Sequence, residues 1–172
     1  MRIQAVDQFN IDEMYTDLLT LGYYVFHDAE LENLCQDIQW IEIWPGLYHS
    51  STLIELDILK KRIDHYTQDF LKLDFVMGGT CQGLDGKVCE WHDDANQKID
   101  LQFLCYQCDL EPKDGGALEM QCFDGITRSY HPRMGDVMIM NHKNLLVHRV
   151  TPLTGDRARI ACSASYKYAL EQ

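Results

Sequence analysis

The stretch EWHDDANQKIDLQFLCY, from Glu90 to Tyr106, places a histidine and two aspartates immediately before an alternating apolar segment. In an extended chain, side chains at positions i and i+2 point to the same side, so His92 and Asp94 would share one face. An imidazole and a carboxylate on one face can chelate a metal ion at two adjacent positions. Asp93 is the competing carboxylate, but the side chains of neighbouring residues diverge in an extended chain.

A divalent iron site built from two histidines and one carboxylate needs one further histidine, and it leaves the opposite side of the metal open. His148 lies in LLVHRVTPLTGDRARIACSASY, where a strand pattern ends in a Pro-Leu-Thr-Gly-Asp turn and a second strand pattern follows. His142 competes for this place, but it lacks the Val-x-Pro and the spaced arginine that follow His148. Without a partner histidine, HDD would be a solvated charged turn.

Three further histidines lie in the N-terminal half: His27, His49 and His65. We expect them to have structural or surface roles. His131 lies in the later half, in YHPRMGDVMIMN.

The composition bounds the class of protein. The chain has 172 residues, of which 46% are hydrophobic and 24% are charged, as in a single globular domain. Its net charge of −12 argues against nucleic acid as a partner and suits an enzyme acting on a small molecule, or on a neutral or basic peptide. We find neither a signal-peptide pattern nor an apolar run long enough to span a membrane.

The cysteines point to the compartment. Their number is odd, 7, and no secretion signal accompanies them, which predicts free thiols in a reducing, cytoplasmic environment. Cys105 and Cys108 form a C-x-x-C without a second pair at zinc spacing, so we expect them to fill space in a strand.

Helical and strand patterns divide the chain. Residues 10–22, 29–44 and 51–74 have helical patterns, although the end of the second could be a strand, and residues 23–28 read as a strand. From Phe75 onward, short apolar runs alternate with Gly, Asp and Pro turns, which is typical of an antiparallel sandwich, barrel or jelly roll. We therefore predict one domain over residues 1–172, with a helix-rich N-terminal support (1–74) and a β-core (75–172).

The segment from about Asp85 to Tyr168 resembles the iron(II)- and 2-oxoglutarate-dependent dioxygenases, in particular their prolyl-4-hydroxylase-like branch. Four blocks occur in the order of that family: WHDDAN, LQFLCYQCDLEPKDGGALEM, YHPRMGDVMIMN and HRVTPLTGDRARIA. They match its H-x-D, its strand, acidic turn and Gly-Gly, its Pro-x-x-Gly strand, and its distal histidine followed by an arginine. The resemblance implies a mainly β fold: a double-stranded β-helix, or jelly roll, with N-terminal α-helices packed on one side.

The same resemblance implies roles for individual residues. His92, Asp94 and His148 would bind iron(II), with 2-oxoglutarate as co-substrate and O₂ as oxidant. An arginine would hold the far carboxylate of 2-oxoglutarate in a bidentate ion pair, which suits a guanidinium group. We assign this role to Arg157, nine residues after His148. Arg159 has the same strand parity, so it is the alternative anchor, or it helps to bind an acidic substrate.

A tyrosine near the co-substrate is also implied. The segment IDLQFLCY alternates, with Ile99, Leu101, Phe103 and Cys105 on one face and Asp100, Gln102, Leu104 and Tyr106 on the other. Tyr106 fits the family's position beside the co-substrate carboxylate, and an ordinary core tyrosine is the alternative. The family branch often has a bulky aromatic residue on the inner face of the last strand. Here Ala161 and Ser163 stand there, which predicts a more open pocket.

The implied activity is hydroxylation of an unactivated C–H bond, with release of succinate and CO₂. The substrate would be a small molecule or amino acid, or a protein side chain such as proline. Asp94 favours hydroxylation over chlorination, because halogenating relatives carry a small residue there. Two alternatives use the same β-core: a non-catalytic sensor that binds metal and 2-oxoglutarate, and a cupin-type metalloprotein. The sequence contains no H-x-H, which argues against the cupin type.

Overall fold

The computed structural model describes residues 2–35, 38–50, 53–67, 70–84, 90–94 and 97–169. In chain order its strands are β1 (Tyr23–His27), β2 (Trp40–Trp44), β3 (Leu47–Ser50), β4 (Leu73–Gly83), β5 (Leu101–Tyr106), β6 (Leu118–Gln121), β7 (Thr127–Tyr130), β8 (Asp136–Asn141), β9 (Val147–Val150) and β10 (Arg159–Tyr168). The helices are α1 (Ile11–Thr20), α2 (Ile54–Thr67) and the 3-10 turn η1 (Ala29–Leu31).

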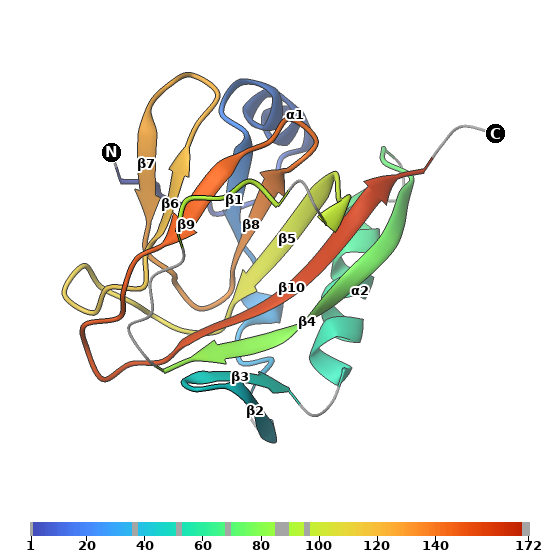
Figure 1. Ribbon diagram of the computed structural model, residues 1–172. Coiled ribbons are helices and arrows are strands. Elements are labelled where there is room, and N and C mark those ends of the chain that lie inside the picture. Colours follow the sequence, from blue (N-terminus) through green and yellow to red (C-terminus); the bar gives the residue numbers. More distant parts are fainter. Residues whose placement is uncertain are drawn as a thin grey trace.

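The strands form two antiparallel sheets (Figure 1). The large sheet has the order β1-β8-β5-β10-β4-β3-β2, and the small sheet has the order β7-β6-β9. Within the described residues, some neighbouring strands come from distant parts of the chain, as when β10 lies between β4 and β5, whereas β2, β3 and β4 are consecutive. This arrangement is the mainly β architecture that the sequence predicts, with few helices.

Two buried cores hold the layers together. One lies between the large sheet and the helices and includes Leu101, Phe103 and Cys105 of β5. The other lies between the two sheets and includes Tyr106 together with Met120 of the small sheet. The predicted alternation of β5 is thereby confirmed, because side chains two residues apart enter the same core.

The helices cover the outer face of the large sheet. α1 contacts β1 and β8, and α2 contacts β10 and β4 (Figure 1). The predicted start of α1 is confirmed: the side chain of Asn10 accepts hydrogen bonds from the backbone N–H groups of Asp12 and Glu13. Among the described residues, neither helix has the length and apolar character needed to cross a membrane.

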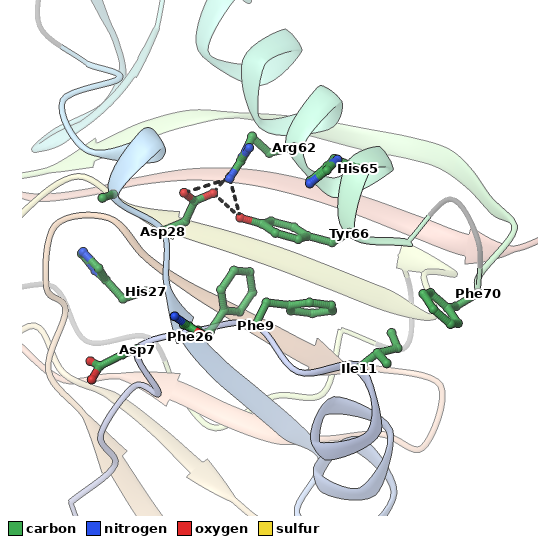
Figure 2. A pocket seen from close by; sticks show the side chains of 12 residues that line it. Asp7, Phe9, Ile11, Phe26, His27, Asp28, Arg62, His65, Tyr66 and Phe70 are labelled. Atoms are coloured by element: carbon green, nitrogen blue, oxygen red, sulfur yellow. Dashed lines mark hydrogen bonds and ion pairs between the residues drawn. The ribbon is translucent and has the colours of Figure 1, made fainter.

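A polar network ties α2 to the chain after β1 (Figure 2). Arg62 donates from Nε and Nη2 to the carboxylate of Asp28, at 2.9 and 3.1 Å. Tyr66 donates its hydroxyl to the same carboxylate. Since the Asp28 side chain is only 6% exposed, these donors compensate a carboxylate that has lost most of its water.

The helix predicted over residues 29–44 is wrong. The described part of that range forms only η1 and then β2, whose sequence WIEIW is rich in β-branched and aromatic residues. The strand alternative for its C-terminal end is correct. The helix predicted over 51–74 is shorter than expected, because β4 begins at Leu73 and places that end of the segment in the sheet. The first 74 residues therefore also supply strands β1, β2 and β3 to the large sheet.

Candidate metal centre

His92 and His148 lie directly opposite each other across a short antiparallel bridge. The backbone N–H of His92 donates to the carbonyl of His148 at 3.0 Å, and the N–H of His148 donates back at 2.9 Å. A pair that exchanges both hydrogen bonds holds its Cα atoms at a fixed separation. β9 carries His148, and this bridge sets the segment before β5 against β9.

The imidazole rings are oriented by backbone carbonyls. Nδ1 of His92 lies 2.7 Å from the carbonyl oxygen of Glu90, and Nδ1 of His148 lies 3.1 Å from that of Leu146. A carbonyl can only accept, so each Nδ1 carries the proton and each Nε2 keeps its lone pair. This is the tautomer that a metal ion needs at Nε2.

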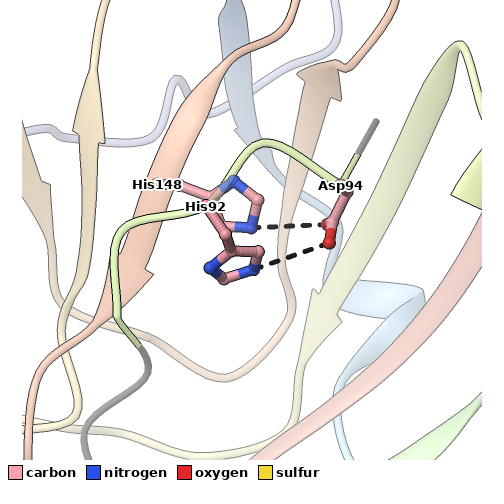
Figure 3. A group of neighbouring side chains, drawn as sticks. All are labelled: His92, Asp94 and His148. Atoms are coloured by element: carbon pink, nitrogen blue, oxygen red, sulfur yellow. Dashed lines mark ion pairs between the residues drawn. The ribbon is translucent and has the colours of Figure 1, made fainter. Parts of the chain in front are cut away.

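Asp94 completes the cluster (Figure 3). Its Oδ1 lies 3.5 Å from Nε2 of His92, and its Oδ2 lies 3.5 Å from Nε2 of His148. The backbone of Asp94 has a φ of 51°, in the left-handed region that few residues other than glycine adopt. Gln97 donates from Nε2 to Oδ1 at 2.9 Å and helps to hold the carboxylate.

The three side chains fit one divalent metal ion. One ligand atom from each residue lies within 4.8 Å of the others. Ligands bound at about 2.1 Å and at right angles to one another are separated by roughly 3 Å, so a small contraction would bring these atoms into a coordination shell. Two imidazoles and one carboxylate form the donor set of a facial triad with open positions.

Burial lowers the pKa of two histidines here, the ligand candidate His148 and its neighbour His142. Burial lowers the pKa of His148, and the charge of Arg159 acts in the same direction. Burial also lowers the pKa of His142 to about 4, with the neighbouring His148 contributing. Nε2 of His142 lies 3.3 Å from the side-chain oxygen of Gln102, and its ring centroid is 5.4 Å from that of His148. His142 therefore packs behind a ligand, and the cluster within the described residues includes neither His142 nor Asp93.

Arg159 and Tyr106 lie together on the inner face of the large sheet. Nη2 of Arg159 donates to the Tyr106 hydroxyl at 3.3 Å, and Nε donates to the carbonyl of Gly116 at 3.1 Å. Within the described part of the chain, no carboxylate lies within ion-pair distance of Arg159. This half-buried guanidinium, beside a buried tyrosine, could therefore form an ion pair with a bound anion.

Arg157 lies elsewhere. It precedes the first residue of β10, its side chain is exposed, and its Nη1 donates to the carbonyl of Asp109 at 2.8 Å. It lines a different cavity, together with Arg2 and Arg133. The structure thus separates two arginines that strand parity alone could not distinguish.

The inner face of β10 and β4 is open beside the arginine. Ala161 faces Tyr106 across the β10–β5 pair, and Ser163 faces Gly79 across the β10–β4 pair. A methyl group added at Gly79 would meet no atom within 4 Å. Ser163 therefore borders free space beside Gly79, whereas Ala161 is buried in the core between the two sheets.

The other candidates are dispersed. Nδ1 of His27 lies 2.9 Å from Asp136, His65 packs on Tyr66, and His49 pairs with Ile41 in the β2–β3 hairpin. The structure describes six cysteines, all as free thiols, and Cys89 lies outside the described residues. Sequence reasoning missed Gln102 as the partner of His142, although it placed Gln102 on the same face as Tyr106.

Comparison with solved structures identifies the fold. A 2OG-Fe(II) oxygenase family oxidoreductase from Burkholderia pseudomallei matches with a TM-score of 0.75 and 12% identity, over 97% of this chain and 94% of that one. A prolyl-4-hydroxylase from Pseudomonas putida matches with a TM-score of 0.63 and 22% identity, over 97% and 99%. HygX from Streptomyces hygroscopicus, with nickel and 2-oxoglutarate bound, matches with a TM-score of 0.73 and 14% identity, over 94% and 89%.

No protein-family model and no curated protein sequence matches the chain. The structural matches cover nearly the whole length of each chain, so the protein has the fold of the 2-oxoglutarate- and iron(II)-dependent oxygenases. The fold class that the resemblance implied is confirmed.

Proposed function

We propose that the protein is an iron(II)- and 2-oxoglutarate-dependent oxygenase that hydroxylates a C–H bond of a small molecule or of a protein side chain. The observation that carries the proposal is the convergence of His92, Asp94 and His148, with both Nε2 atoms directed at the carboxylate. The fold and the nickel and 2-oxoglutarate bound to HygX support the same assignment.

In this proposal His92, Asp94 and His148 hold the iron. Iron(II), when bound, would activate O₂, which is the oxidant for hydroxylation, while 2-oxoglutarate would be oxidised to succinate and CO₂. The chain itself contributes orientation. The carbonyls of Glu90 and Leu146 keep the imidazoles in the binding tautomer, and the low pKa of His148 keeps its ring neutral at physiological pH.

Arg159 is the residue we propose as the anchor of the 2-oxoglutarate carboxylate, in place of Arg157. Its guanidinium has no carboxylate partner among the described residues, and its charge acts on His148, which places the two side chains within electrostatic reach. Tyr106 already accepts a hydrogen bond from Arg159, so its own hydroxyl proton is free to donate to the same carboxylate. Arg159 would then neutralise the far carboxylate of the co-substrate, and both groups would orient it.

Substrate would enter along the open inner face of β10 and β4. Gly79 and the small side chain of Ser163 leave space there. The prolyl-4-hydroxylase among the matching structures supports a prolyl residue as one candidate substrate. A non-catalytic sensor would bind metal and 2-oxoglutarate at the same residues, but it would form no succinate.

The test is an anaerobic titration of metal-free protein with iron(II) and 2-oxoglutarate, in which the visible metal-to-ligand charge-transfer band is recorded. We expect a band in the wild type and none in His92→Ala. Arg159→Ala is expected to need about 10-fold or more 2-oxoglutarate for half of the band, because a hydrogen-bonded charge pair is lost. Arg157→Ala tests the sequence-based assignment in the same assay.

The outcomes separate the hypotheses. If Arg157→Ala raises the 2-oxoglutarate concentration needed for half of the band and Arg159→Ala does not, Arg157 is the anchor. Admission of O₂ after the titration, with succinate measured, separates an enzyme from a sensor. Absence of a band in folded wild-type protein supplied with iron would contradict the proposed function.

A further inference from the structure

A cavity of about 650 Å³ lies apart from the metal centre. Its walls come from the N-terminal segment, the chain after β5, the β7–β8 connection and the chain before β10. A volume of this size is typical of sites for small ligands. None of the three metal-centre residues lines it.

Three arginines from separate segments converge on this cavity: Arg2, Arg133 and Arg157. Arg133 already has a carboxylate partner, since its Nε lies 3.4 Å from Oδ1 of Asp136. Arg157 donates only to a backbone carbonyl, and no carboxylate of the described residues lies within 4.0 Å of the Arg2 or Arg157 guanidinium. Two guanidinium groups therefore face the cavity without a counter-ion.

The acidic side chains of the cavity are largely engaged elsewhere. Asp136 also accepts from the Tyr130 hydroxyl at 2.7 Å, and Glu111 pairs with Lys113 at 2.7 Å. Asp109 accepts a backbone N–H through Oδ1 at 3.0 Å. Asp7 lies exposed at the rim. Two of the four acids, Asp136 and Glu111, thus pair with other charged groups, whereas Asp109 accepts a backbone N–H and Asp7 is exposed to solvent. Within the described residues, none of them forms an ion pair with Arg2 or Arg157.

His131 adds a polar group to the same wall. Its Nδ1 is buried and has no hydrogen-bond partner among the described residues. Burial lowers the pKa of His131, and the nearby charge of Arg2 acts in the same direction, so the ring is neutral. Since Nδ1 is closed to solvent, a ligand in the cavity would contact the accessible part of the half-buried neutral ring.

We propose that this cavity is a binding site for a small oxyanion, a carboxylate or phosphate group, held between Arg2 and Arg157 with His131 beside it. Guanidinium groups match the planar, bidentate acceptors of such anions. The site goes beyond the proposed oxygenase function and does not depend on it. It gives a role to Arg157, which lines this cavity and donates only to a backbone carbonyl among the described residues.

The two sites are separated by a wall of two tyrosines. Tyr130 lines the anion cavity, and its ring centroid is 5.3 Å from that of Tyr106, which contacts Arg159 on the other side. Arg157 and Arg159 therefore lie on opposite sides of this wall. The effect on anion binding can be measured separately for a substitution of each.

The test is a calorimetric titration of metal-free protein with inorganic phosphate, and in a parallel arm with malonate, at constant ionic strength set by chloride. We expect saturable binding at one site. Arg157→Gln and Arg2→Gln should each weaken it by about tenfold, since each removes a charge-assisted hydrogen bond. Both side chains are exposed, so these variants should fold normally. The anion that binds more tightly identifies the ligand class.

Two control variants make the result specific. Lys61→Gln removes the same charge from an exposed position on α2 and should leave binding within twofold of the wild type. Arg159→Gln should also retain phosphate binding. Binding that survives Arg157→Gln but is lost in Arg159→Gln would assign the anion to the oxygenase site and overturn the proposal, as would an absence of saturable binding for both anions.

Discussion

His92 and His148 exchange both of their backbone hydrogen bonds and direct both Nε2 atoms toward Asp94. The metal centre is thus assembled by a strand-like pairing between two segments from opposite ends of the β-core. Side-chain tautomers are then set by the local carbonyls of Glu90 and Leu146. Because the backbone positions the ligands, much of the site is formed before a metal ion binds.

Two substitutions of Asp94 separate the effect of losing a metal ligand from the effect of backbone strain. Asp94→Gly and Asp94→Ala both remove the carboxylate, but only glycine tolerates the φ of 51° without cost. We expect both variants to lose the rise in Tm that iron(II) or manganese(II) gives the wild type. In urea unfolding without metal, Asp94→Gly should be more stable than Asp94→Ala by about 1 kcal/mol. Equal stability would show that the left-handed backbone is not strained.

Tyr106→Phe tests whether Tyr106 is more than a core residue. The ring is fully buried and would keep its packing, while the hydrogen bond with Arg159 would be lost. Burial raises the pKa of Tyr106 to about 12, so the wild-type hydroxyl stays protonated. We expect the Kd for 2-oxoglutarate to rise roughly fivefold, which corresponds to about one neutral hydrogen bond. The charge-transfer titration measures it.

Tyr130→Phe is the matched control for that variant. It removes another buried tyrosine hydroxyl, whose partner is Asp136 and not Arg159. Its stability should fall, but its affinity for 2-oxoglutarate should stay near the wild-type value. Equal loss of affinity in both variants would point to a general effect of weakened packing.

Asp28 makes stability depend on pH. Burial alone would raise the pKa of the Asp28 carboxyl, but the hydrogen bonds from Arg62 and Tyr66 outweigh it and hold the pKa below its ordinary value. The stabilisation is therefore present above the unfolded-state pKa of about 3.9 and is lost as the pH falls through the lower folded-state pKa. Asp28→Asn should cost roughly 1–3 kcal/mol at pH 7 and flatten the decline in acid.

Urea midpoints measured between pH 7 and pH 3 would check this linkage. Asp64→Asn removes one negative charge from an exposed position on α2 and serves as the control. A wild-type decline in acid that Asp28→Asn leaves unchanged would place the responsible carboxylates elsewhere in the chain.

Gly78 and Gly79 are neighbours on β4 that face opposite sides of the large sheet. A methyl group at Gly78 would lie 2.3 Å from the backbone oxygen of Ser163 and 2.8 Å from Leu56, whereas at Gly79 it would meet nothing within 4 Å. Gly78→Ala should therefore destabilise the protein by about 1–3 kcal/mol through overpacking, and Gly79→Ala should not. The Tm values of the two variants test this prediction. A similar fall in Tm for both would argue against an open inner face.

Local patterns in the sequence were sufficient wherever one element decides the outcome. The cap at Asn10 and the alternation of β5 follow from spacing that holds over a few residues. His92 and Asp94 do meet, but the chain is not extended there, since Asp94 has a φ of 51°. The segment ending in WIEIW failed as a helix, because sheet pairing with β3 and not local helical spacing determines its structure.

The choice between Arg157 and Arg159 shows where the sequence alone stops. Both have the parity of the inner face, so spacing cannot distinguish them. Only tertiary structure determines that β10 begins at Arg159 and that Tyr106 of the neighbouring strand β5 lies beside it. It also determines that Arg157 lines the anion cavity. The sequence by itself determined the chemical types of the ligands and the class of fold. The partner of each charged side chain was decided by contacts between strands that are distant in the chain, because these contacts depend on sheet order and register.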